Sequence, residues 1–130
     1  MNGGFNEGHR TWQCINPNYK EINIEKDLKA EKSVYRYYQK LLAIKSNDET
    51  AIYGRTREYD HENKKIIAYS REYNGHKLFV VGNFSKKTVS YQLPEWIRSK
   101  VLINNYDNLK QNEQTVELKP YQAVVYSVDE

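Results

Sequence analysis

The chain is short of the residues that crosslink a protein or anchor it in a membrane. Cys14 is its single cysteine, which excludes an internal disulfide and fits a reducing compartment. No apolar run approaches the roughly 20 residues that a membrane-spanning helix needs. The first residues are polar and lack the apolar stretch of a signal peptide. We therefore expect a soluble, cytoplasmic protein.

Ligands for metal ions and reactive nucleophiles are equally scarce. No two of the soft candidate ligands stand at a ligand spacing, and Cys14 has no histidine in a recognisable catalytic pattern. The Gly3-Gly4 pair neither follows a strand nor opens a helix, so it is no phosphate loop. We expect no metal, no cofactor and no nucleophilic catalysis. The candidate ligands weighed are His9, Cys14, His61 and His76.

The charges also exclude a broad class of partners. The chain carries 20 basic and 17 acidic residues, a net charge of +3, and the two signs alternate along its whole length. A nucleic-acid-binding face would need a basic block with interleaved aromatic residues, and none stands out. We therefore expect no nucleic-acid partner.

Carboxylates are plentiful, and glycoside hydrolysis needs two of them about 5 to 9 Å apart. Those in this chain sit mostly on helix faces and loop tips beside Lys or Arg, where such charges are solvated. We therefore predict no catalytic residue. The examples are Glu21, Glu25, Asp27, Glu31 and Glu62. A sugar platform built from Trp96 and Tyr106 would require both rings on one exposed face, which the sequence does not establish.

What the chain does hold is a strong hairpin signal. Two runs rich in β-branched and aromatic residues, 66–73 and 76–84, flank Asn74-Gly75. Asn-Gly favours a type I′ turn, because that turn needs a positive φ at both central positions. The run from Leu78 to Val81 is apolar throughout, which predicts a central strand buried on both faces.

The part of the chain before the hairpin predicts an irregular segment followed by helices. Residues 1–23 are rich in turn formers, yet their apolar residues are too many for a free tail: Phe5, Trp12, Ile15, Tyr19 and Ile22. Asn23 predicts the cap of a short helix through Leu28. A longer helix is expected over 33–46. Its apolar stripe consists of Val34, Tyr37, Tyr38, Leu41, Leu42 and Ile44.

The remainder predicts strands joined by turns. The fold class expected is mainly β, an antiparallel β-sandwich preceded by the irregular segment and one or two helices. Seven strands are predicted, at 52–59, 66–73, 76–84, 86–93, 101–104, 115–118 and 121–128.

Several tracts resemble one known family. The oligo-1,6-glucosidase branch of glycoside hydrolase family 13 has the tract Asn-Ala-Gly-Phe … Trp … Val-Asn-Pro-Asn-Tyr-Lys-Glu-Ile-Asn. This chain has a similar series: Asn2-Gly3-Gly4-Phe5, then Trp12, then Ile15-Asn16-Pro17-Asn18-Tyr19-Lys20-Glu21-Ile22-Asn23. The likeness continues in register through the helix at 33–42 and through 52–54, 67–71, 77–85 and 118–123. It therefore covers nearly the whole chain.

The resemblance implies a sandwich of the alpha-amylase C-terminal type. It implies that residues 1–47 are the end of a (β/α)8 catalytic barrel, with its last helix, and that residues 48–130 are the C-terminal β-domain. In that family the catalytic carboxylates precede the Asn-Ala-Gly-Phe tract. The resemblance therefore assigns no catalytic residue to this chain. The function implied is a non-catalytic accessory domain that packs against and stabilises the barrel of an α-glucosidase-type enzyme.

Several alternatives stay open. The chain could instead be a free-standing carbohydrate-binding module or a protein-interaction domain, and its barrel-facing surface could mediate self-association. Relatives with similar tails act on isomaltose-type oligosaccharides, dextran ends, trehalose phosphate or sucrose. The parent enzyme's substrate is therefore not specified.

Overall fold

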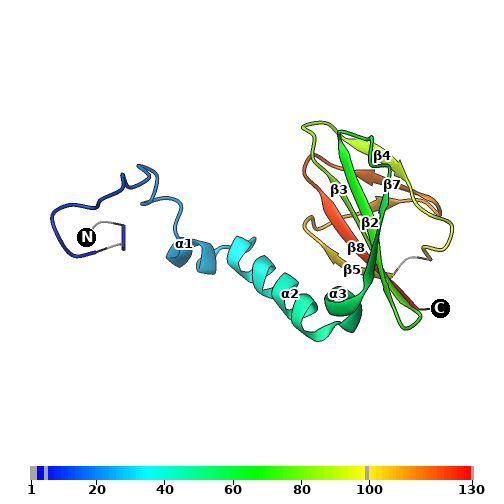
Figure 1. Ribbon diagram of the computed structural model, residues 1–130. Coiled ribbons are helices and arrows are strands. Elements are labelled where there is room, and N and C mark those ends of the chain that lie inside the picture. The colour runs from blue at the N-terminus through cyan, green and yellow to red at the C-terminus, as the bar shows by residue number, and fades with distance from the viewer. Residues whose placement is uncertain (1–2, 5, 99, 130) are drawn as a thin grey trace. The chain divides into compact units, whose positions relative to one another are not determined.

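The computed structural model describes residues 3–4, 6–98 and 100–129, in two compact units, 1–43 and 44–130 (Figure 1). Phe5, one of the apolar residues noted in the first segment, lies outside the described residues. Within the described residues, no helix has the length and apolarity to cross a membrane.

The first unit is irregular up to Asn23, as predicted. Tight turns fold it locally; the amide of Tyr19 donates to the carbonyl of Asn16 at 3.0 Å. Tyr19 is half-buried, whereas the Trp12 side chain is 95% exposed. The apolar residues of this segment are thus only partly covered by the chain's own atoms.

Two capped helices follow. Asn23 caps α1 (Ile24–Lys29) by accepting from the amide of Lys26 at 2.9 Å. Ser33 caps α2 (Val34–Asn47) by accepting from the amide of Arg36 at 3.1 Å. The Asn23 cap agrees with the sequence prediction. In both caps a side-chain oxygen satisfies an amide that has no partner within the helix.

A third short helix corrects the prediction of a strand beginning at Ile52. Ile52 and Tyr53 belong to α3 (Glu49–Tyr53). Asp48 caps this helix by accepting from the amide of Ala51 at 2.9 Å. The cap outweighs the β propensity of two residues, because propensity is a weak preference that local hydrogen bonds override.

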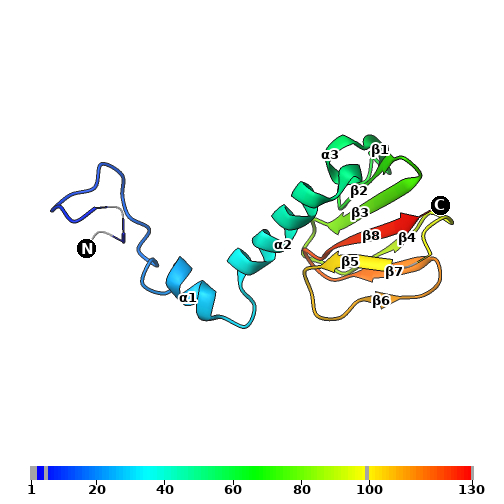
Figure 2. The ribbon, with the colours of Figure 1, turned by 90° about the horizontal axis from the view of Figure 1, so that it is seen from below.

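In the described part of the chain, eight strands form two antiparallel sheets, one more strand than predicted. Figure 2 shows their arrangement. The larger sheet has the order β1-β2-β3-β8-β5 and the smaller β4-β7-β6. The additional strand is β6, two residues that lie between the predicted strands at 101–104 and 115–118. The strands are β1 (Arg55–Tyr59), β2 (Ile66–Tyr73), β3 (His76–Asn83), β4 (Val89–Gln92), β5 (Lys100–Asn104), β6 (Lys110–Gln111), β7 (Thr115–Leu118) and β8 (Ala123–Asp129).

The hairpin is confirmed. β2 pairs with β3 from Ile66↔Asn83 to Tyr73↔His76. Asn74 and Gly75 have φ values of 49° and 80°, the two positive values of a type I′ turn. β3 is the middle strand of its sheet, as its apolar run predicts.

The core lies between the two sheets. Phe79 of β3 is at its centre, with its ring 6.4 Å from the ring of Tyr91 in β4 and 6.4 Å from that of Tyr126 in β8. Facing apolar side chains of two packed sheets are what define a sandwich. The other buried members of this core are Ile66, Ala68, Val81, Leu93, Ile97, Val116, Leu118 and Val124.

Candidate functional site

The inner face of the large sheet changes from apolar to charged toward one end. The register places Tyr59 beside Ala68, then Arg57 beside Ser70, then Arg55 beside Glu72. Because side chains alternate along a strand, these pairs all point to the same face as Phe79. At the far end β3 adds Lys77, which pairs with Glu72 in the register.

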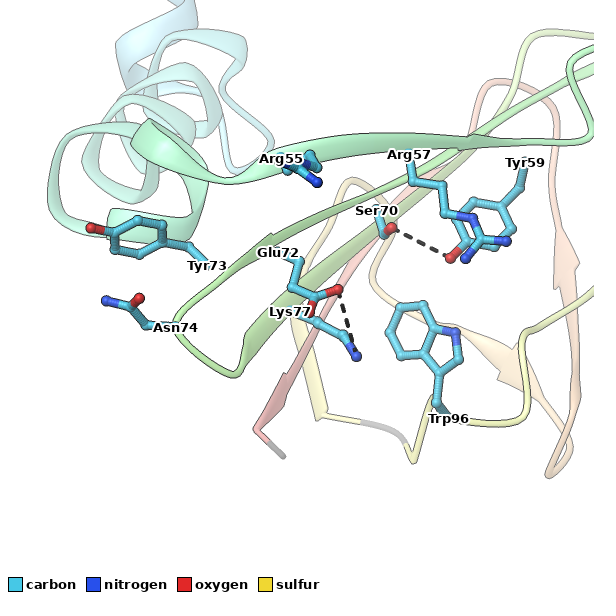
Figure 3. A pocket seen from close by; sticks show the side chains of 9 residues that line it. All are labelled: Arg55, Arg57, Tyr59, Ser70, Glu72, Tyr73, Asn74, Lys77 and Trp96. Carbon is cyan, nitrogen blue, oxygen red and sulfur yellow. Dashed lines mark hydrogen bonds and ion pairs between the residues drawn. The ribbon is translucent and has the colours of Figure 1, made fainter.

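This charged end is hollowed into a pocket with a volume of about 530 Å³ (Figure 3). Arg55 and Arg57 line it from β1, with the Arg57 side chain lying against the ring of Tyr59; Glu72 and Lys77 lie together on the neighbouring strands, and the indole of Trp96 closes one side. We call this the end pocket. Its described lining residues are Arg55, Arg57, Tyr59, Ser70, Glu72, Tyr73, Asn74, Lys77 and Trp96.

Neighbouring groups hold several of these side chains in place. The ammonium of Lys77 lies 3.6 Å from a carboxylate oxygen of Glu72 and 5.7 Å from the centre of the Trp96 ring. Trp96 meets the core ring of Phe79 edge-on at 5.7 Å. The guanidinium of Arg57 lies 5.4 Å from the centre of the Tyr59 ring, within the range of a cation–π contact.

The chemistry of the end pocket suits binding. Its described lining contains three cations against one carboxylate, Glu72. Hydrolysis of a glycosidic bond needs two carboxyl groups, and this lining does not supply them. Arginine guanidinium groups recognise carboxylates and phosphates, and an exposed indole face accepts the apolar face of a ligand. The arrangement therefore fits an anionic ligand that carries a ring.

Sequence reasoning missed the end pocket, although a signal for it exists. Arg55, Arg57 and Tyr59 alternate along one strand, so all three occupy the same face. Their position opposite Ser70 and Glu72 follows only from the pairing of β1 with β2.

The carboxylates predicted to be solvated mostly form exposed ion pairs. Glu25 pairs with Lys29 at 2.8 Å, and this partner lowers the pKa of Glu25. Glu21 pairs with Lys26 at 2.7 Å. His61 lies 3.8 Å from Glu62 on an exposed loop. Exposed pairs of this kind contribute little to stability.

Asp27 differs from the other carboxylates. Its oxygens accept from the amides of Tyr35 and Val34, at 2.8 and 3.0 Å, and from the hydroxyl of Ser33 at 2.8 Å. The Tyr35 amide and then the Ser33 hydroxyl lower the pKa of Asp27. The side chain thus joins α1 to the N-terminus of α2, where the helix dipole favours a negative charge.

The histidines and the cysteine are dispersed. Among the described residues, no three His, Cys, Asp or Glu side chains gather where they could hold a metal ion. His9 and Cys14 are exposed. His76 joins two elements: its Nδ1 lies 2.8 Å from the hydroxyl of Thr50 in α3, and its Nε2 lies 3.0 Å from that of Ser127 in β8.

The two rings considered for a sugar platform contact different parts of the domain. Trp96 lines the end pocket. The hydroxyl of Tyr106 donates to the carbonyl of Pro120 at 2.8 Å, and the ammonium of Lys119 lies 5.5 Å from its ring. Tyr106 therefore supports the turn between β7 and β8.

Two family models match this chain. One, described as Alpha amylase, catalytic domain, matches residues 1–54, and the other, described as Alpha-amylase SusG C-terminal domain, matches residues 66–125. The first match takes in α1, α2 and α3, and the second takes in β2 to most of β8.

Curated relatives match over almost the whole chain. An oligo-1,6-glucosidase from Bacillus cereus is 37% identical, and a trehalose-6-phosphate hydrolase from Bacillus subtilis is 34% identical. Each match covers 96% of this chain and 23% of the relative. The chain thus spans about a quarter of the length of the curated relatives it matches.

Solved structures agree with these relatives. Trehalose-6-phosphate hydrolase from Bacillus licheniformis is 32% identical, with a TM-score of 0.88 over 99% of this chain and 24% of the enzyme. An isomaltulose synthase mutant from Erwinia rhapontici, in complex with sucrose, is 33% identical, with a TM-score of 0.88 over 100% of this chain and 24% of the enzyme.

Proposed function

Since this chain belongs to glycoside hydrolase family 13, the alpha-amylase family, we propose that it serves as the C-terminal accessory part of an enzyme acting on α-glucosidic bonds. In this proposal it packs against the catalytic (β/α)8 barrel and stabilises it. The proposal places the catalytic carboxylates outside these 130 residues.

The proposed division assigns residues 1–47 to the end of the barrel and residues 48–130 to the β-domain. Contacts of α3 support placing it with the β-domain. The Arg71 side chain of β2 donates through Nε to the carbonyl of Thr50 at 3.1 Å, and His76 of β3 bonds the Thr50 hydroxyl. The short helix is thus attached to the sheet by side chains of two strands.

The observation that carries the proposal is the exposed apolar line on α2. The side chains of Val34, Tyr38 and Leu42 are 75%, 61% and 51% exposed, and a spacing of four places them on one side of the helix. Burying Val34 and Leu42 against a partner would contribute about 1.5–3 kcal/mol for each side chain. Because α2 lies in the segment that matches the catalytic domain, we assign the barrel as that partner.

A chimera tests the proposal. The chain would replace the matching quarter of the Bacillus cereus oligo-1,6-glucosidase. We expect the chimera to be an active enzyme. Leu42→Asp is expected to lower its free energy of unfolding by about 2 kcal/mol and therefore its melting temperature by several degrees. Ala43→Asp, on the opposite side of the helix, is the matched control and leaves the melting temperature nearly unchanged. Equal melting of the two variants would contradict barrel packing.

The isolated chain tests the assignment of catalysis. Incubated with isomaltose or a nitrophenyl glucoside, it is expected to release no product, because it supplies neither a general acid nor a nucleophile. Turnover above a buffer blank that survives repurification would refute this part of the proposal.

A further inference from the structure

We propose that the end pocket binds a sugar phosphate, with the phosphate held by Arg55 and Arg57 and the sugar ring placed against Trp96. This site lies on the β-domain, and its residues differ from those that carry the proposed packing against the barrel. It uses no residue of the α2 line.

The charge of the end pocket selects an anion. Arg55 and Arg57 are two residues apart on β1, so they project from the same face of one strand. Both are exposed, and so they are open to an incoming group. Guanidinium groups match the oxygens of a phosphate, because each presents N–H donors in a planar fork.

The opposite wall suits the sugar. Trp96 is half-buried and fixed by its edge-on contact with Phe79, so its ring is already ordered before a ligand arrives. The carboxylate of Glu72 can accept from sugar hydroxyls, and the ammonium of Lys77, 3.6 Å away, helps to hold this side chain in place. Fixed partners of this kind reduce the ordering cost of binding.

The size of the end pocket limits the ligand. Its volume of about 530 Å³ lies in the range of small-molecule sites, and its walls come from β1, β2, β3 and the turn that carries Trp96 (Figure 3). A monosaccharide phosphate fits this volume, whereas an inorganic phosphate would leave the wall formed by Trp96 without a contact.

Tryptophan fluorescence gives a direct test. The chain has two tryptophans, so Trp12→Phe leaves Trp96 as the sole tryptophan fluorophore, and Trp12 is too exposed for its ring to support the fold. In that background we expect glucose 6-phosphate to change the Trp96 emission saturably. Glucose and inorganic phosphate are each expected to bind at least about tenfold more weakly.

Variants assign the response to the end pocket. Arg55→Gln with Arg57→Gln is expected to raise the half-saturation concentration at least about tenfold. Arg98→Gln with Lys100→Gln removes the same charge outside the end pocket. This double variant is expected to change the half-saturation concentration less than about threefold. Circular dichroism checks that each variant is folded.

Three results would overturn the proposal. The first is no saturable change in emission up to about 20 mM glucose 6-phosphate. The second is an equal loss of affinity for glucose 6-phosphate in the two double variants. The third is that inorganic phosphate binds as tightly as glucose 6-phosphate. Amide chemical shifts give a second readout, in which the largest changes are expected along β1 and around Ser70; changes confined to other strands would also contradict the site.

Discussion

Gly54 is the residue at which the chain passes from α3 to the sheet. Its amide donates to the carbonyl of Thr50 at 3.0 Å. A Cβ atom at this position would collide with that same carbonyl oxygen and would lie 3.1 Å from both the Cβ of Arg71 and the amide nitrogen of Glu72. Only a residue without a side chain lets α3 come this close to β2.

Replacing Gly54 is therefore expected to be costly. Gly54→Ala is predicted to destabilise the β-domain by about 1–3 kcal/mol, because backbone atoms have to move to make room. Gly82→Ala is the control, since its Cβ would meet Phe84 and Ala123 at ordinary distances of 3.5 and 3.6 Å. Urea unfolding of both variants measures the effect; equal stability would show that the close approach at Gly54 is unimportant.

Two core tyrosines predict how stability depends on alkaline pH. Burial, with smaller contributions from Asp60 and Tyr59, raises the pKa of Tyr91 to about 12, and burial raises that of Tyr126 to about 12. An unfolded tyrosine titrates near pH 10. Because the folded pKa values are raised, their stabilising contribution is complete below pH 10 and is lost as the pH rises from 10 to 12.

Tyr91→Phe tests this pH dependence and keeps the ring next to Phe79. Each tyrosine makes unfolding easier by about 1.4 kcal/mol per pH unit in this window. The free energy of unfolding of the variant is therefore expected to fall less steeply with pH than that of the wild type, and the two slopes differ by about 1.4 kcal/mol per pH unit. Urea unfolding at pH 9, 10 and 11 measures the slopes; identical slopes would contradict the burial of the Tyr91 hydroxyl.

At the scale of elements, neighbouring residues predict the hairpin of β2 and β3, whereas the pairing of β1 with β2 does not follow from them. The hairpin was predicted because Asn74-Gly75 and its flanking runs carry their own signal. No helix is predicted at α3 from the sequence, although its Asp48 cap is visible there, because Ile52 and Tyr53 suit a strand equally well. The residues of β1 alone do not define the end pocket, because Arg57 lies opposite Ser70 only once β1 has paired with β2.

The junction between α1 and α2 predicts a response to acid. The pKa of Asp27 is lowered in the folded chain. The ionised carboxylate therefore stabilises the junction above the pKa of an unfolded Asp, about 3.9, and this stabilisation is lost as the pH falls through the folded pKa. Below about pH 4 the first turn of α2 is expected to fray.

Asp27→Ala is expected to show the frayed turn already at neutral pH. Amide chemical shifts of Val34 and Tyr35, followed from pH 7 downward, report it. Glu31→Ala, which removes an exposed carboxylate between the two helices, is the control and keeps the turn intact at pH 7. An intact first turn in Asp27→Ala would show that Ser33 caps α2 without help.

At the scale of the whole molecule, the resemblance read from the sequence is confirmed by the family models and the curated relatives. The expected fold class is also confirmed, as a mainly antiparallel two-sheet domain. The two compact units differ in what holds them together. Residues 44–130 enclose the core around Phe79, whereas α1 and α2 contain no buried residue.

Amide hydrogen exchange of the isolated chain tests the central claim, that residues 1–47 complete their packing only against a catalytic barrel. The account predicts that the amides of residues 6–22 and of α2 exchange much faster than those of β3, since local opening is easiest where few apolar contacts are buried. Exchange in residues 6–22 as slow as in the strand from Leu78 to Asn83 would contradict the account, because that segment would then belong to the chain's own core.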